Sequence, residues 1–127
     1  MAKNSKTFSF EFFPPKTASG QEKVISLGKE FESVPAEYYS VTFGAGGSTQ
    51  QGTIDTCRSL FNATKVPIAP HISGIGSDKS SIKSMLQLYK DEGFKKLVVL
   101  RGDLPSGFGS VGDFPYAINL IEFINEN

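Results

Sequence analysis

The sequence contains only one cysteine and one histidine among its 127 residues. A single cysteine, Cys57, excludes a disulfide framework or a cysteine metal cluster within the chain, and a reducing cytoplasm is the compartment we expect. A single histidine, His71, excludes a histidine-rich metal site, so we predict no metal centre. The chain also lacks the Gly-x-Ser-x-Gly elbow of serine hydrolases, which leaves a catalytic triad poorly supported.

The sequence has no excess of either charge, because 13 Lys and Arg residues balance 13 Asp and Glu residues. No global field attracts nucleic acid or an anionic membrane, and we expect neither as a partner. No apolar run approaches the roughly 20 residues of a membrane-spanning helix. The first apolar stretch is short and contains Glu11, which argues against a secretory signal. We therefore expect a single cytoplasmic domain over residues 1–127.

Two apolar periodicities alternate along the chain. The strands that we expect span residues 7–13, 38–43, 66–72 and 97–100. The helices that we expect follow them and carry one apolar stripe each. The stripes are Val24, Leu27, Phe31 and Val34; Ile54, Cys57, Leu60 and Phe61; Ile82, Met85, Leu86 and Tyr89; and Ala117, Leu120, Ile121 and Ile124. The last strand is a continuous apolar run, typical of a strand covered on both faces. Ser80 is the expected N-cap of the third helix, and Gly93 is its expected end.

Strict alternation of strands and helices predicts an α/β fold with a parallel sheet. Four βα units fill the chain, whereas a TIM (β/α)8 barrel has eight and typically needs about 250 residues. The length therefore matches half of a barrel. A sheet of four strands would leave two edges unpaired and its apolar inner face partly open, which favours association with another polypeptide.

Polar residues gather where the strands end, which is the working face of a barrel. They are Glu11, Thr42, His71, Arg101, Gly102 and Asp103. Alternation places Glu11 opposite Phe8, Phe10 and Phe12, so its carboxyl points into the barrel if those rings pack against helices. Desolvation there would favour the protonated form that a general acid needs. A solvated glutamate on a loosely covered strand explains the same alternation equally well.

The remaining polar features have structural explanations as well as functional ones. The loop Gly44 to Thr49 lets backbone amides approach a ligand, and a following helix N-terminus favours phosphate. It is neither a dinucleotide fingerprint nor a P-loop, and a tight βα connection explains it better. By itself His71 is better explained as a hydrogen-bonded structural residue, and Arg101 and Asp103 could pair with neighbours on a loop.

Four segments occur together in one order. They are Phe8 to Lys16 (FSFEFFPPK), Ser40 to Thr49 (SVTFGAGGST), Ala69 to His71 (APH) and Leu100 to Pro105 (LRGDLP). In order and interval they closely resemble the methylenetetrahydrofolate reductase family, and they span nearly the whole chain. The resemblance implies that the chain is the N-terminal half of a TIM barrel. It also implies FAD, which takes a hydride from NADH or NADPH and reduces 5,10-methylenetetrahydrofolate to 5-methyltetrahydrofolate.

The resemblance also implies roles for individual residues. Glu11 matches the acid that promotes opening of the folate ring, and Asp103 matches the carboxylate beside flavin and pterin. The positions that match FAD contacts are Thr42, His71, Leu100, Arg101, Gly102 and Asp103. The expected partner is the folate substrate, within one-carbon and methionine metabolism, and a homo-oligomer is expected where the full barrel is present.

The sequence departs from the family pattern at one three-residue segment and one single residue, and two other functions compete with the enzyme. Ile72-Ser73-Gly74 stands where the family often has Leu-Thr-Cys, and Asn119 stands where it often has Asp. One competing function is a catalytically silent half-barrel that at most binds flavin or associates with another half. The other is an unrelated α/β phosphate-binding module that uses the loop Gly44 to Thr49.

Overall fold

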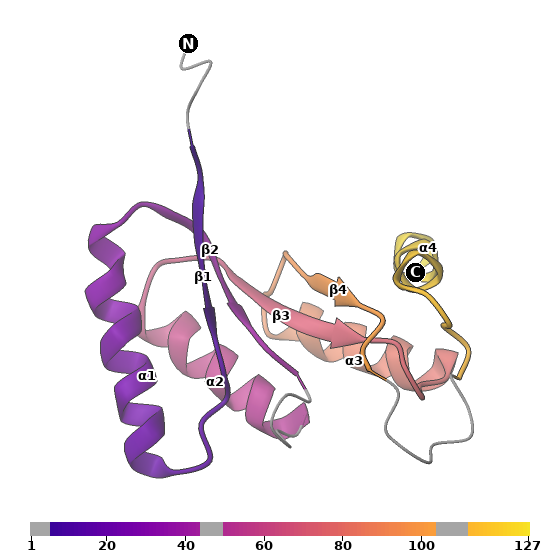
Figure 1. Ribbon diagram of the computed structural model, residues 1–127, viewed down its shortest axis with the longest axis horizontal. Helices are drawn as coiled ribbons and strands as arrows, with labels where there is room; N and C mark the ends of the chain where they lie inside the picture. The colour runs from indigo at the N-terminus through magenta and orange to yellow at the C-terminus, as the bar shows by residue number, and fades with distance from the viewer. Residues whose placement is uncertain (1–5, 44–49, 104–111) are drawn as a thin grey trace. The chain divides into compact units, whose positions relative to one another are not determined.

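The computed structural model describes residues 6–43, 50–103 and 112–127, in which four strands are each followed by a helix (Figure 1). The elements are β1 (Phe8–Phe12), α1 (Ala18–Glu30), the 3-10 turn η1 (Phe31–Ser33), β2 (Ala36–Val41), α2 (Gln50–Ala63), β3 (Ile68–Ser73), α3 (Lys79–Asp91), β4 (Val98–Leu100) and α4 (Ala117–Glu126). All strand pairs are parallel, and the strand order is β1-β2-β3-β4. The predicted α/β class and βα alternation are confirmed, and the topology is consistent with part of a TIM barrel.

The chain divides into two compact units, Met1–Pro70 and His71–Asn127. The boundary falls inside β3. Its first three residues pair with β2 in the first unit, and its last three pair with β4 in the second. The strand bounds differ from the prediction by one or two residues at every end except the last residue of β4, as expected where turn residues and strand residues share an apolar pattern.

An aromatic cluster forms the core of the first unit between β1, η1 and β2. The ring of Phe10 stacks on Phe31 at a centroid distance of 4.5 Å and meets the edge of Tyr39 at 6.0 Å. The ring of Phe12 meets Tyr39 at 5.2 Å. Phe10 and Phe12 therefore share one face of β1, as the alternation predicts. Phe8 belongs to the same face by sequence but remains 52% exposed.

Close contact between α1 and α2 depends on Gly28. A Cβ at this position would lie 2.6 Å from Cδ2 of Leu60, so a larger residue would require the Leu60 side chain to shift. The hydroxyl of Tyr39 donates to the Gly28 carbonyl at 2.8 Å. Leu27, which the sequence assigns to the apolar stripe, is 41% exposed. The prediction that Leu27 is buried is therefore wrong, because α1 directs Gly28 rather than Leu27 toward α2.

Cys57 lies in the buried face of α2, as the helical spacing predicts, and it is fully buried. Burial raises the pKa of its thiol to about 12, since a thiolate loses its hydration in this position. A thiol in such surroundings is a small core residue rather than a nucleophile.

In the second unit, α3 begins at Lys79 with Asp78 as its N-cap. The Asp78 side chain accepts a hydrogen bond from the Ser81 amide at 2.7 Å, and this bond lowers the pKa of the carboxyl. The prediction of Ser80 as the cap is wrong by two residues, because the Asp78 carboxylate accepts the hydrogen bond from the Ser81 amide. Gly93 has a φ of +88° after α3, which confirms it as the C-terminal glycine.

β4 is less covered than its apolar sequence suggests. Val98, Val99 and Leu100 are each half-buried, whereas the prediction was a strand covered on both faces. Among the described residues β4 pairs with β3 alone, which explains the partial coverage. In the part of the chain that the structure describes, no helix combines the length and apolar character needed to cross a membrane.

Replacing Tyr39 with Phe should lower the free energy of unfolding by about 1 kcal/mol. The change keeps the ring in the aromatic cluster and removes only the donor to Gly28. Urea denaturation followed by circular dichroism measures the loss. Tyr38→Phe is the matched control, because Tyr38 is the adjacent residue and its ring is only half-buried. Equal loss in the two variants would contradict the role of the buried hydrogen bond.

Cys57 should resist thiol reagents in the folded chain and react when denaturant is added. Because the folded pKa is raised to about 12 from an ordinary value of 9.0, folding favours the neutral thiol. The resulting stability is complete below pH 9.0 and is lost as the pH rises toward about 12. Cys57→Ala should therefore lose less stability over this pH range than the parent chain. A folded thiol with an ordinary pKa would contradict this.

Candidate functional site

The residues that the sequence singles out lie in the carboxyl-terminal half of a strand or directly after it. Glu11 is the penultimate residue of β1, and Thr42 directly follows β2. These two positions lie on paired strands of the first unit, since Glu11 is in register with Ser40. His71 lies in β3, and Leu100 ends β4. These positions belong to the second unit, together with Arg101, Gly102 and Asp103 after β4.

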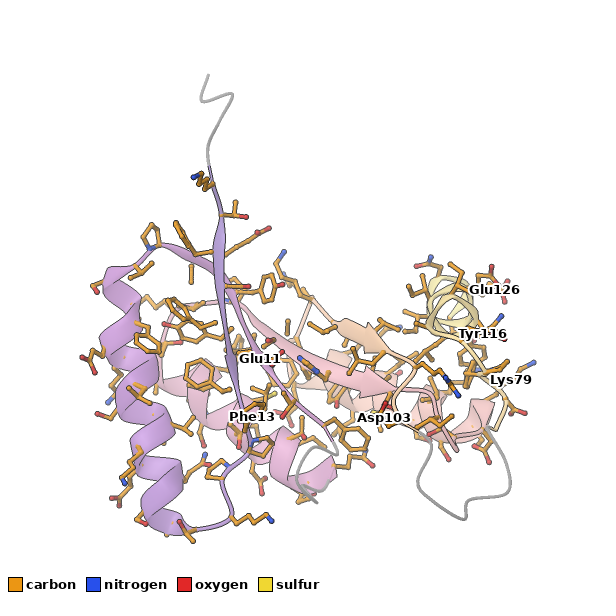
Figure 2. All side chains as sticks on the ribbon, in the orientation of Figure 1. Glu11, Phe13, Lys79, Asp103, Tyr116 and Glu126 are labelled. Carbon is orange, nitrogen blue, oxygen red and sulfur yellow. The ribbon has the colours of Figure 1, made fainter. Side chains whose placement is uncertain are left out.

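Glu11 extends from β1 on the side opposite α1, while its neighbours Phe10 and Phe12 pack into the aromatic core (Figure 2). The direction that alternation predicts is therefore present. The side chain is exposed, so of the two alternatives the described residues agree with a solvated glutamate on a loosely covered strand. A parallel strand has two faces, and only the helix-facing one is covered here.

Thr42 is held through its main chain and leaves its hydroxyl available. Its amide donates to the Phe12 carbonyl at 3.0 Å, and its carbonyl accepts from the Thr53 hydroxyl at 2.8 Å. Its Oγ1 is buried and has no hydrogen-bond partner among the residues that the structure describes. Such an atom loses its hydration without compensation, which suits the polar atom of a ligand. The loop Gly44 to Thr49 lies outside the described residues.

His71 is buried in β3, with 5% of its surface exposed. Its carbonyl accepts a hydrogen bond from the Tyr89 hydroxyl at 3.3 Å, which ties this part of β3 to α3. The sequence favours a structural histidine when the residue is taken alone, and burial agrees with that interpretation. The same burial would hold the ring in a fixed orientation toward a ligand.

Backbone hydrogen bonds fix the turn after β4. The Gly74 amide donates to the Leu100 carbonyl at 3.1 Å, and the Ile75 amide donates to the Arg101 carbonyl at 2.8 Å. The parallel ladder between β3 and β4 thus continues past both strands. The Arg101 and Asp103 side chains are exposed on this anchored backbone, and Figure 2 shows Asp103 at the end of β4.

Gly102 occupies a position that only glycine can fill. Its φ is +86°, in the left-handed region, and an added Cβ would lie 2.2 Å from the Ser73 hydroxyl and 2.7 Å from Cγ2 of Ile75. The Ser73 hydroxyl donates to the Arg101 carbonyl at 3.1 Å. The sequence marks Ser73 only as a departure from a family pattern, so its contact with this turn was missed.

The structure also accounts for Gly74 and Asn119, which likewise depart from the family pattern. A Cβ at Gly74 would approach Cβ of Phe114 to 2.9 Å, so the missing bulk makes room for that ring. The Asn119 side chain accepts from the Tyr116 amide at 3.1 Å and thereby caps α4. Asparagine and aspartate both serve this purpose through a side-chain oxygen.

One cavity of the second unit is separate from these residues. It has a volume of about 270 Å³ and lies between α3, the start of β4 and the end of α4. Its walls are mainly apolar, and they include Leu97, which precedes β4, rather than Arg101, which follows it. Among residues 6–43, 50–103 and 112–127, no group of three or more His, Cys, Asp and Glu side chains forms a metal site.

The chemistry available is thus divided between the two units. The first offers an exposed carboxylate and a buried hydroxyl on neighbouring strands, which suit proton transfer and hydrogen bonding. The second offers a guanidinium and a carboxylate on a fixed turn, with a buried imidazole in the adjacent strand. These groups are suited to orienting a polar or anionic ligand rather than to nucleophilic attack.

The family model described as methylenetetrahydrofolate reductase matches residues 1–127. Methylenetetrahydrofolate reductase 2 of Schizosaccharomyces pombe is 33% identical over 124 residues, which are 94% of this chain and 19% of that protein. The 5,10-methylenetetrahydrofolate reductase of Pectobacterium carotovorum is 31% identical over 93% of this chain and 39% of its own length. Methylenetetrahydrofolate reductase (NADH) 1 of Arabidopsis thaliana is 33% identical over 92% of this chain and 20% of its own length.

The chain spans between about one fifth and two fifths of these curated relatives. The match nevertheless extends through all four βα units and includes every residue proposed for the site. The chain therefore belongs to the methylenetetrahydrofolate reductase family.

Proposed function

We propose that this chain is the N-terminal half of a catalytic barrel that reduces 5,10-methylenetetrahydrofolate to 5-methyltetrahydrofolate. The observation that carries the proposal is the family match over residues 1–127, in which Glu11 lies near the carboxyl end of β1 and Asp103 follows β4. Catalytic groups of (β/α)8 enzymes come from these strand ends. The rest of the barrel would come from polypeptide corresponding to the longer relatives.

FAD is the proposed cofactor, with NADH or NADPH as the hydride donor. The residues that would hold it are Thr42, His71, Leu100, Arg101, Gly102 and Asp103. One of their features fits such a ligand, because the buried Thr42 hydroxyl lacks a partner among the described residues. When bound, the flavin supplies two-electron redox chemistry that no side chain offers.

Glu11 is the proposed acid that delivers a proton to the folate as its five-membered ring opens. Its carboxyl lies on the face of β1 that the helices leave uncovered (Figure 2). In a complete barrel this face is the interior, where the added strands and the folate would desolvate the carboxyl and favour its protonated form. Asp103 is the proposed carboxylate that orients the pterin beside the flavin.

The wider setting of this function is also a proposal. The absence of net charge and the single cysteine support a cytoplasmic enzyme that acts without nucleic acid or membrane. Its partner is the folate substrate, its reaction belongs to one-carbon and methionine metabolism, and the complete barrel forms a homo-oligomer.

A second candidate function is a catalytically silent half that associates with another polypeptide. The observation that favours it lies in the second unit, where β4 is half-buried and α4 carries exposed apolar residues. Tyr116 is 64% exposed, Ile118 56% and Ile121 37%. An open strand beside an apolar helix face favours pairing with a further βα unit.

Glu11→Gln, made in a polypeptide that completes the barrel, should keep flavin binding and flavin reduction by NADH or NADPH. Folate reduction should fall by about 10²- to 10⁴-fold, because the amide cannot supply the proton. Stopped-flow absorbance separates the two half-reactions. Glu37→Gln is the control, since Glu37 is an exposed carboxylate on the neighbouring strand β2. Normal folate turnover by Glu11→Gln would remove Glu11 from the mechanism.

The purified chain distinguishes the two candidate functions. A yellow protein that bleaches with NADH or NADPH supports the enzyme, whereas a colourless chain that self-associates supports the silent half. In the second case, Ile118→Glu should weaken association in sedimentation velocity, because it places a charge on the exposed face of α4. Leu27→Glu is the matched control on the exposed surface of α1. Equal effects of the two variants would argue against the α4 surface.

A further inference from the structure

We propose that Ser73 is a positioning residue that sets the orientation of Arg101 and Asp103 by holding the carbonyl between Arg101 and Gly102. The proposal rests on the proposed function, in which Arg101 and Asp103 contact flavin and pterin. Ser73 contacts neither ligand in this scheme, and it acts only through the backbone of the turn.

Ser73 is well placed to hold this carbonyl. It is the last residue of β3, it pairs with Leu100 in register, and only 8% of its surface is exposed. Its hydroxyl donates to the Arg101 carbonyl at 3.1 Å. The Arg101 carbonyl oxygen also accepts from the Ile75 amide at 2.8 Å. The Ser73 hydroxyl and the Ile75 amide therefore both donate to the Arg101 carbonyl and fix its direction.

The direction of that carbonyl decides the course of the turn. The peptide group that carries it joins Arg101 to Gly102, so its orientation and the φ of +86° at Gly102 are set together. The Ser73 hydroxyl occupies the space that a Cβ at Gly102 would need, at 2.2 Å from that atom. Ser73 therefore leaves no room for a side chain at residue 102. Arg101 and Asp103 flank Gly102, and their side chains are exposed on either side of it.

The chain itself tests the lock without any ligand. Ser73→Ala should accelerate hydrogen exchange at the Ile75 amide by about fivefold and shift the Gly102 amide resonance, because one of two donors is lost. Ser73→Thr retains a hydroxyl and should restore both signals. Ser84→Ala, an exposed serine of α3, is the matched control and should change neither. Unchanged exchange and an unchanged Gly102 resonance in Ser73→Ala would overturn the proposal.

Flavin titration separates positioning from a merely structural contribution. Ser73→Ala should bind FAD about tenfold more weakly and show an altered flavin absorption spectrum, while Ser73→Thr returns both to the parent values. A parent-like affinity and spectrum in Ser73→Ala would refute the positioning role even if exchange had changed. If the parent chain binds no FAD, the titration is made in a polypeptide that completes the barrel, where absence of FAD binding would contradict the proposed function. The Ile75 exchange and the Gly102 resonance then decide whether Ser73 sets the turn.

Discussion

The parallel hydrogen bonding of β3 is the constraint on which the other elements depend. All six of its residues are buried, including Pro70, and each half of the strand sets the register of one neighbour. A parallel strand needs a crossover before the next strand can pair, so the helices follow from the same pairing. Within each unit, parallel pairing places the carboxyl ends of neighbouring strands, with their polar residues, at the same edge of the sheet. His71 is buried for the same reason, since it belongs to the central strand.

The candidate site combines a fixed backbone with exposed functional groups. The main chain of Thr42 is bonded on both sides, and the Arg101 carbonyl has two donors. The carboxylates of Glu11 and Asp103 remain exposed. This division suits a ligand site, because ordering the backbone in advance lowers the entropic cost of binding. The exposed groups then gain their strength only when a ligand and further polypeptide exclude water around them.

The departures from the family pattern show how neighbours compensate for a changed residue. Gly74 loses bulk, and the ring of Phe114 approaches to fill the adjacent space. Asn119 keeps an oxygen at the position where it caps α4. Ser73 keeps a hydroxyl, and that hydroxyl is the group that contacts the turn after β4. Ser73 and Asn119 thus keep the oxygen on which the local structure depends, whereas the space left at Gly74 is taken by a neighbouring side chain.

The sequence by itself determined the α/β class, the order of the βα units and the family, because periodicity and local motifs lie within short stretches of chain. It also determined the burial of Cys57 and the glycine that ends α3. Only the tertiary structure decided that Gly28 rather than Leu27 faces α2, since helix rotation depends on the partner surface. Likewise, Glu11 has the direction that alternation predicts, but its exposure depends on which elements cover that face of β1. The bond from Ser73 to the turn after β4 joins residues 28 positions apart, and strand register rather than sequence proximity brings them together.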